Sequence, residues 1–116
     1  MSFNEQIKNI FKNFKVDGVE IPVEFLKYKG DKETYITFQE IINSPELSCD
    51  NECEYSVKKF DFDIYTKGNY INILKAVKQK LKANEWTWVE DSEDLFEDDT
   101  KFFHKVTTFE KENYIE

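Results

Sequence analysis

Three side chains of this sequence could bind a transition metal: Cys49, Cys53 and His104. A site built on the two cysteines would need two more ligands, and His104 is the only histidine in the chain. Structural zinc sites normally use four ligands, most of them cysteine or histidine. We therefore expect Cys49 and Cys53 to be free loop thiols, and we predict neither a metal site nor a cofactor.

A second candidate is the acidic stretch at residues 90–99. Carboxylates at this density can bind Ca²⁺ or Mg²⁺ through their oxygen atoms. The stretch lacks the central glycine and the alternating spacing of an EF-hand loop, so a solvated acidic loop is the better interpretation. Its carboxylates are Glu90, Asp91, Glu93, Asp94, Glu97, Asp98 and Asp99.

Two apolar residues, Leu95 and Phe96, interrupt these carboxylates. Apolar side chains in such a place either fold under their own loop or contact another subunit. We therefore treat this part of the stretch as a candidate interface. It consists of Asp94, Leu95, Phe96, Glu97, Asp98 and Asp99.

Little else in the sequence supports catalysis. His104 with Asp99 or Glu97 could form a general base and its orienting carboxylate. No nucleophile motif or glycine-rich loop accompanies them, so we expect a strand histidine with a structural hydrogen bond. Trp86 and Trp88 could stack on a sugar or a base, but we expect them to pack in the core beside a helix. The sequence thus predicts a protein that is not an enzyme.

The composition disfavours two further classes of function. The formal net charge is −8, and all 16 positive residues are lysines. Nucleic-acid binding through a basic face is disfavoured, because affinity for phosphates depends on neutralising them, and bidentate recognition needs arginine. No apolar run approaches the roughly 20 residues that span a bilayer, and no signal-peptide core is present, so we expect a soluble intracellular protein with no membrane partner.

The elements that position these residues are organised around residues 55–83. Phe60, Phe62 and Ile64 alternate with polar residues, which predicts that the longest strand, at 55–66, is buried on one face. A turn and a helix follow, with Asn69 as the N-cap. The apolar stripe of this helix is Ile71, Leu74, Val77 and Leu81.

The N-terminal third is predicted to contain a helix and two strands. Residues 2–15 form the helix, which begins with a capping box at Ser2 and Glu5. Strands at 19–26 and 34–42 are rich in β-branched and aromatic residues, and we expect them to pair as a β-hairpin.

After a polar loop at 43–53 and the central unit, the sequence predicts short strands at 86–89 and 102–109. Residues 111–116 are expected to be a flexible tail. These elements predict one α+β domain over residues 1–116. Its mainly antiparallel sheet contains a β-hairpin, and its two helices pack on one face.

In their order and their amino-acid sequence these segments resemble the small tail-terminator, or tail-completion, proteins of tailed bacteriophages and prophages. The resemblance covers residues 22–109. It rests on Ile21-Pro-Val-Glu-Phe25, Thr34-Tyr-Ile-Thr-Phe38, Phe60-Asp-Phe-Asp-Ile-Tyr-Thr-Lys-Gly-Asn69 and Leu95-Phe-Glu-Asp-Asp-Thr-Lys-Phe-Phe-His-Lys105. In the family the last segment commonly has glycine where this chain has Lys101, so the turn before the last strand is expected to differ.

The resemblance implies a non-enzymatic structural role in the virion tail, at the head–tail junction, for a protein made in the bacterial cytoplasm. Such proteins form a ring, typically hexameric, on the head-proximal end of the tail tube and stop its polymerisation. The implied partners are other copies of the chain, the tail tube protein, neck or connector proteins and, in contractile tails, the sheath protein. DNA passes through the lumen without specific binding, and residues 90–99 become a contact or lumen-facing element.

A different class of function is also compatible with the composition. A small acidic adaptor or immunity-type module would use its acidic face to bind a basic partner. Tail-tube, sheath or portal genes beside this one would separate these two hypotheses. The most informative single experiment is the mass of the assembly, alone and with tail tube present.

Overall fold

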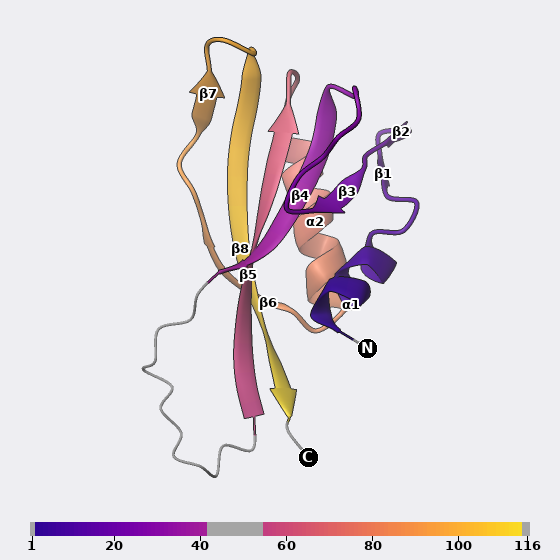
Figure 1. The fold of residues 1–116 in the computed structure, drawn as a ribbon, viewed down its shortest axis with the longest axis vertical. Helices are drawn as coiled ribbons and strands as arrows, with labels where there is room; N and C mark the ends of the chain where they lie inside the picture. The colour runs from indigo at the N-terminus through magenta and orange to yellow at the C-terminus, as the bar shows by residue number, and fades with distance from the viewer. Residues whose placement is uncertain (1, 42–54, 115–116) are drawn as a thin grey trace.

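The computed structural model describes residues 2–41 and 55–114, which form two helices and eight strands (Figure 1). The helices are α1 (Phe3–Ile10) and α2 (Ile71–Ala83). The strands are β1 (Lys15–Val16), β2 (Val19–Glu20), β3 (Val23–Phe25), β4 (Thr34–Ile41), β5 (Tyr55–Thr66), β6 (Thr87–Asp91), β7 (Leu95–Glu97) and β8 (Phe102–Tyr114). The predicted α+β fold class is confirmed.

One six-stranded sheet contains every described strand except β1 and β2, which form a separate antiparallel pair. The strand order is β3-β4-β5-β8-β6, and β7 pairs with the beginning of β8, before the part that β6 covers. All neighbouring strands are antiparallel except β3 and β4. Both helices lie on the same side of the sheet (Figure 1), so their predicted placement on one face is confirmed.

The alternating side chains of β5 separate the two faces of this sheet. Phe60, Phe62 and Ile64 point toward the helices, and at most 1% of each is exposed. The Phe62 ring packs between Phe38 of β4 and Phe109 of β8, with ring centroids 6.1 and 6.3 Å away. Burial of these apolar side chains is the main source of stability, and the predicted buried face of this strand is confirmed.

Helix α2 begins at Ile71 and its N-cap position is Tyr70, so the predicted N-cap, Asn69, is one residue too early. Asn69 Oδ1 nevertheless accepts the N–H of Ile71 at 2.8 Å. Its buried residues are Ile73, Val77 and Leu81, whereas Ile71 is 48% exposed. The predicted stripe is therefore wrong at Ile71. Spacings of three or four residues fit both sets, and only packing against the sheet selects between them.

Helix α1 has the predicted N-terminus but is shorter than expected. Ser2 Oγ accepts the N–H of Glu5 at 3.2 Å, as the capping box predicts. The helix ends at Ile10, and Asn13 in the following turn has a φ of 56°. Because a residue in the left-handed region cannot continue a right-handed helix, the prediction of a helix to residue 15 is wrong.

Strands β3 and β4 are parallel, with Val23 opposite Ile36 and Phe25 opposite Phe38. The predicted hairpin between these two segments is therefore wrong. Leu26, directly after β3, has a φ of 67°, and its N–H bonds to the carbonyl of Phe38 at 2.9 Å. The chain turns here and returns along the sheet before β4 begins, so β4 runs in the same direction as β3 and pairs antiparallel with β5.

Strand β8 continues past its predicted end at Phe109. Its last residues pair with the first residues of β5, beginning with Tyr55 opposite Tyr114. Because neither β4 nor β6 reaches this level, the sheet ends in a two-stranded ribbon (Figure 1). The predicted flexible tail is wrong for residues 111–114, and residues 115–116 lie outside the described residues. With 13 residues against 12 in β5, β8 is the longest of the described strands.

Candidate functional site

The face of the sheet opposite the helices, which we call the open face, carries a row of stacked rings. Tyr28 stacks on Tyr35 with ring centroids 4.6 Å apart, and Tyr35 stacks on Tyr65 at 4.9 Å. Tyr65 then stacks on His104 at 4.3 Å. The register sets these spacings, because Tyr65 of β5 lies opposite both Tyr35 of β4 and His104 of β8. We call these four residues the aromatic ladder.

Asp63 connects the aromatic ladder to the polar groups beside it. His104 Nε2 lies 2.9 Å from one carboxylate oxygen of Asp63, and Gln39 Nε2 donates to the other at 3.1 Å. The structural hydrogen bond expected for this histidine is present. Its partner is neither Asp99 nor Glu97, the carboxylates considered above for a catalytic pair, because the β5–β8 register brings a carboxylate from 41 residues away to His104.

Two tyrosines of the ladder, Tyr35 and Tyr65, remain neutral near physiological pH. Burial raises the pKa of Tyr65 to about 12, and the charge of Asp63 acts in the same direction. Burial also raises the pKa of Tyr35, with a further contribution from Glu97. A phenol that holds its proton cannot serve as a base or a nucleophile, so these rings can pack and donate hydrogen bonds.

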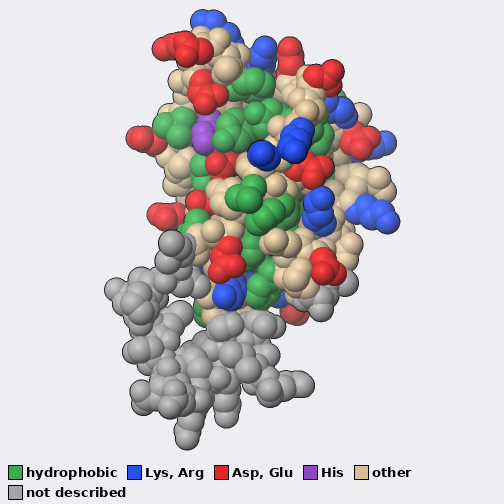
Figure 2. Space-filling view, in the orientation of Figure 1, with side chains coloured by type: hydrophobic (Ala, Val, Ile, Leu, Met, Phe, Trp, Pro, Cys, Tyr) green, Lys and Arg blue, Asp and Glu red, His purple; other side chains and the backbone are tan. Residues whose placement is uncertain are grey.

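Carboxylates lie around the ladder on the same face. Asp61 accepts a hydrogen bond from Thr108 Oγ1 at 2.6 Å, and Glu90 lies opposite Thr108 in the β6–β8 pairing. With Val106 they line a shallow hollow. Figure 2 shows the histidine (purple) among hydrophobic (green) and acidic (red) side chains. The open face is therefore both aromatic and acidic.

The six predicted interface residues lie on and around β7, which pairs only with β8 among the described strands. Leu95 and Phe96 are 39% and 47% exposed, so they do not fold under the chain. The Phe96 ring packs on Phe103 of β8, with centroids 4.9 Å apart, and Phe103 is also exposed. The exposed carboxylates beside this apolar pair are Glu97, Asp98 and Asp99.

Asp94, the remaining member, is held by two donors. The Tyr70 hydroxyl and Lys105 Nζ both donate to its Oδ1, the lysine at 3.1 Å. The hydrogen bond from Tyr70 lowers the pKa of Asp94, and Lys105 acts in the same direction. The expectation of a solvated loop over residues 90–99 is therefore wrong in part, since β6 and β7 include five of its residues and Asp94 anchors the connection.

Tyr70 and Phe103 were not singled out from the sequence. With Gly68 and Asn69 they line an apolar hollow between the start of α2 and β8. The period of two along β8 could have indicated Phe103, because it shares the helix-facing side with Phe109. Its exposure could not be read from that pattern.

On the helix side, Asp91 is the centre of a polar cluster. Its carboxylate accepts hydrogen bonds from Lys78 at 2.7 Å and Trp88 at 2.9 Å. Thr107 donates a third at 2.7 Å. Burial alone would raise the pKa of Asp91, but these donors outweigh it, and the pKa lies below its ordinary value of 3.8.

The two tryptophans near this cluster differ in burial. Trp86 is 3% exposed and packs edge-on against Phe60, so the expected core position is confirmed. Trp88 is 45% exposed, with the Lys78 ammonium 5.1 Å from its ring centroid. The prediction of core packing is therefore wrong for Trp88, which lies at the outer edge of the helix layer.

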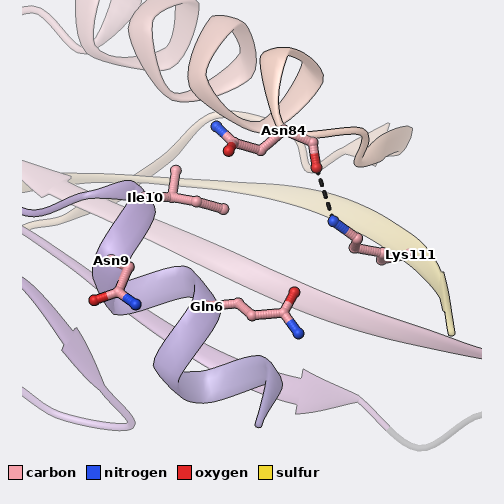
Figure 3. A pocket seen from close by; sticks show the side chains of 5 residues that line it. All are labelled: Gln6, Asn9, Ile10, Asn84 and Lys111. Atoms are coloured by element: carbon pink, nitrogen blue, oxygen red, sulfur yellow. Dashed lines mark hydrogen bonds between the residues drawn. The ribbon is translucent and has the colours of Figure 1, made fainter. Parts of the chain in front are cut away.

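A further hollow lies where α1 approaches the end of α2 (Figure 3). Lys111 Nζ donates to the carbonyl of Asn84 at 2.8 Å and so closes the C-terminal end of α2 against β8. A cation is favourable there because it complements the helix dipole. The lining consists of Gln6, Asn9, Ile10, Asn84 and Lys111.

Within residues 2–41 and 55–114, no group of three metal-ligating side chains converges. Cys49 and Cys53 lie outside the described residues, so their state as free thiols stays a prediction. In the same part of the chain, no helix has both the length and the hydropathy needed to cross a membrane.

Comparison of the chain with protein-family models and with curated proteins found no match. Its functional interpretation therefore rests on the surfaces described above. These surfaces are an aromatic and acidic open face and an exposed apolar pair at an edge strand. A third is α2, which carries Lys75, Lys78, Lys80 and Lys82. In chemical terms they are suited to protein contacts.

Proposed function

We propose that this protein is a tail terminator of a bacteriophage or a related tail-like particle, forming a ring on the head-proximal end of the tail tube. The observation that carries the proposal is the exposed apolar pair, Phe96 and Phe103, on the β7–β8 edge. Both residues lie in one of the segments through which the sequence resembles this family.

The apolar pair has the composition of an interface centre. Interface cores are enriched in aromatic residues and depleted of charge, with polar groups at the rim. Phe96, Phe103 and Leu95 provide the apolar part, and Asp98 and Asp99 lie next to them in the sequence. A patch that meets a different surface on the neighbouring copy makes a heterologous contact, and a series of such contacts closes into a ring.

In this role the ring is hexameric and contacts the tail tube protein, neck or connector proteins and, in a contractile tail, the sheath protein. It lies at the head–tail junction, and its subunits are made in the bacterial cytoplasm. DNA passes through without specific binding, which the formal net charge of −8 favours, because affinity for phosphates depends on positive charge.

The test is the mass of the assembly, measured alone and with a phage tail tube protein. We expect a hexamer, either free or only on tube ends, and shorter tubes when the chain is present during polymerisation. Phe96→Ser combined with Phe103→Ser should prevent capping while the circular dichroism spectrum stays unchanged. Val19→Ser is the matched control, since Val19 is 57% exposed on β2, outside the main sheet.

A cross-linked or tube-bound species that never exceeds a dimer, together with unchanged tube lengths, would contradict this function. The acidic open face favours one alternative, a small adaptor or immunity-type module that binds a basic protein. Such a module would form a complex with that protein and leave tube length unchanged. The same measurements therefore separate the two functions.

A further inference from the structure

On opposite sides of the sheet, carboxylates lie around the aromatic ladder and lysines lie along α2. Lys67 is also on the open face, 5.4 Å from the Phe102 ring centroid, and it pairs with Glu33. Asp61, Asp63, Glu90 and Glu97 place negative charge on the open face, around the aromatic ladder. On the other side, α2 carries four lysines and no carboxylate: Lys75, Lys78, Lys80 and Lys82. A chain with a formal net charge of −8 thus concentrates positive charge on one helix.

The outer face of α2 is available for contact. Lys75 and Lys82 are seven residues apart, so they lie on one side of the helix, away from its buried residues. Both are exposed, and among the described residues neither has an ion-pair partner. Ile71, four residues before Lys75, adds apolar surface on the same side because it is 48% exposed.

The open face is the side of the sheet that no described helix covers (Figure 1). Glu90 and Glu97 are exposed on it, whereas Asp61 and Asp63 are half-buried. A sheet face that carries large aromatic rings buries apolar area when another element packs over it. Around these rings, lysines are the charges that such an element would need.

We infer that the open face of one copy binds the outer face of α2 of the next copy of this chain. The inference rests on the proposed ring and names two surfaces that join its subunits in addition to the apolar pair, Phe96 and Phe103. Lys75 and Lys82 then find carboxylate partners, which neither has among the described residues of its own copy. The helix of one copy covers the uncovered sheet face of its neighbour, as α2 covers the opposite face in its own chain.

The direction of assembly follows from the charges. The two surfaces lie on opposite sides of one sheet, so each contact uses a different patch on each copy and continues from copy to copy. A two-fold dimer through either surface would place carboxylates against carboxylates or lysines against lysines, which is unfavourable. The charge distribution therefore favours a head-to-tail series over a symmetric pair.

Carbodiimide cross-linking tests the contact directly, because it joins lysine amines to carboxylates that touch. An equal mixture of isotope-labelled and unlabelled full-length chain distinguishes links between copies from links within one copy. We expect links between copies from Lys75 or Lys82 to Glu90 or Glu97, in concentrated solution or on tube ends. If no links between copies form, or if they join only other residue pairs, the inference is overturned.

Charge reversal gives a second test, in which mixing two charge-reversed variants should restore the self-association that each has lost. Lys75→Glu with Lys82→Glu, and separately Glu90→Lys with Glu97→Lys, should each weaken self-association at least about tenfold. An equal mixture of the two variants should restore it, because every contact in an alternating ring then pairs opposite charges. Lys12→Glu with Lys15→Glu is the control for the lysine variant, since it makes the same change of net charge at exposed positions outside both surfaces and should associate like the unchanged chain.

The outcomes separate this inference from the proposed function. A hexamer whose mass is unchanged in the Lys75→Glu, Lys82→Glu variant keeps the ring and rejects this interface. Links between the two surfaces in a species no larger than a dimer keep the interface and reject the ring. Folded variants whose mixture fails to associate also reject the charge pairing.

Discussion

Side chains from the same strands are held by different interactions on the two faces of the sheet. In β5, Phe60 and Phe62 face the helices and are almost fully buried, whereas Asp63 and Tyr65 face the open side. The first set is held by apolar burial, which scales with the area removed from water. The second set is held by ring stacking and hydrogen bonds, each of small net value because water competes for the same groups.

This difference predicts which substitutions should lower stability and which should weaken contacts between copies. A change on the helix side removes packing that no other element can replace, so it should act on the free energy of unfolding. A change on the open face removes a smaller interaction, so it should act on contacts between copies more than on stability. The experiments below probe this division, from the largest expected effect on stability to the smallest.

Phe62→Ala should have the largest effect. It removes a fully buried ring from the centre of the core, and such truncations cost about 3–5 kcal/mol. That approaches the total stability of many small domains, so we expect unfolded or insoluble protein. Urea denaturation, or the soluble fraction on expression, measures the loss. A melting temperature equal to that of the unchanged chain would show that the two faces are assigned the wrong way round.

Asp91→Asn should lower the free energy of unfolding by about 1.5–3 kcal/mol at neutral pH, because it removes the charge that accepts three hydrogen bonds. The pKa of Asp91 is lowered in the folded protein, so its contribution is present above the ordinary value of 3.8 and is lost as the pH falls through the folded pKa. The stability difference between variant and unchanged chain should therefore shrink below pH 3.8.

Urea denaturation from neutral pH downward measures this difference. Asp98→Asn is the control for net charge, since Asp98 is an exposed carboxylate outside the cluster. A difference that stays constant down to the lowest pH at which the protein folds would show that the charge of Asp91 does not stabilise the helix side.

Asp63→Ala should cost about 1–2 kcal/mol, because it leaves His104 and Gln39 without their shared acceptor on the open face. Gln39→Ala removes only one donor and should cost less. A double-mutant cycle with these two substitutions isolates the Asp63–Gln39 coupling energy. If Asp63→Ala destabilised the protein as much as Phe62→Ala, the open face would share the structural role of the core.

Phe103→Ala should have the smallest effect on stability, about 1 kcal/mol or less, because the side chain is 38% exposed and packs on another exposed ring. It is the same substitution as Phe62→Ala, on the same side of the sheet but beyond the covered core. Thermal melts of the two variants measured together test the contrast. An equal loss of stability in both would show that the β7–β8 edge belongs to the core and is not free for contacts.

Local patterns in the sequence determined much of this fold. The alternation in β5 identified its buried face, because side chains of a strand point to opposite sides at every step. Ser2 and Asn69 marked helix starts, because their oxygens accept N–H groups that have no partner within the helix. Leu95 and Phe96 were recognised as an apolar interruption, and their exposure agrees with an interface.

Tertiary structure alone decided which distant residues meet. The partner of His104 is Asp63 because β5 and β8 adopt one register out of several that the sequence allows. The parallel direction of β3 follows from the left-handed turn at Leu26, a residue type with no preference for that conformation. Local periodicity carries no information about register or strand order, since both depend on long-range packing free energy.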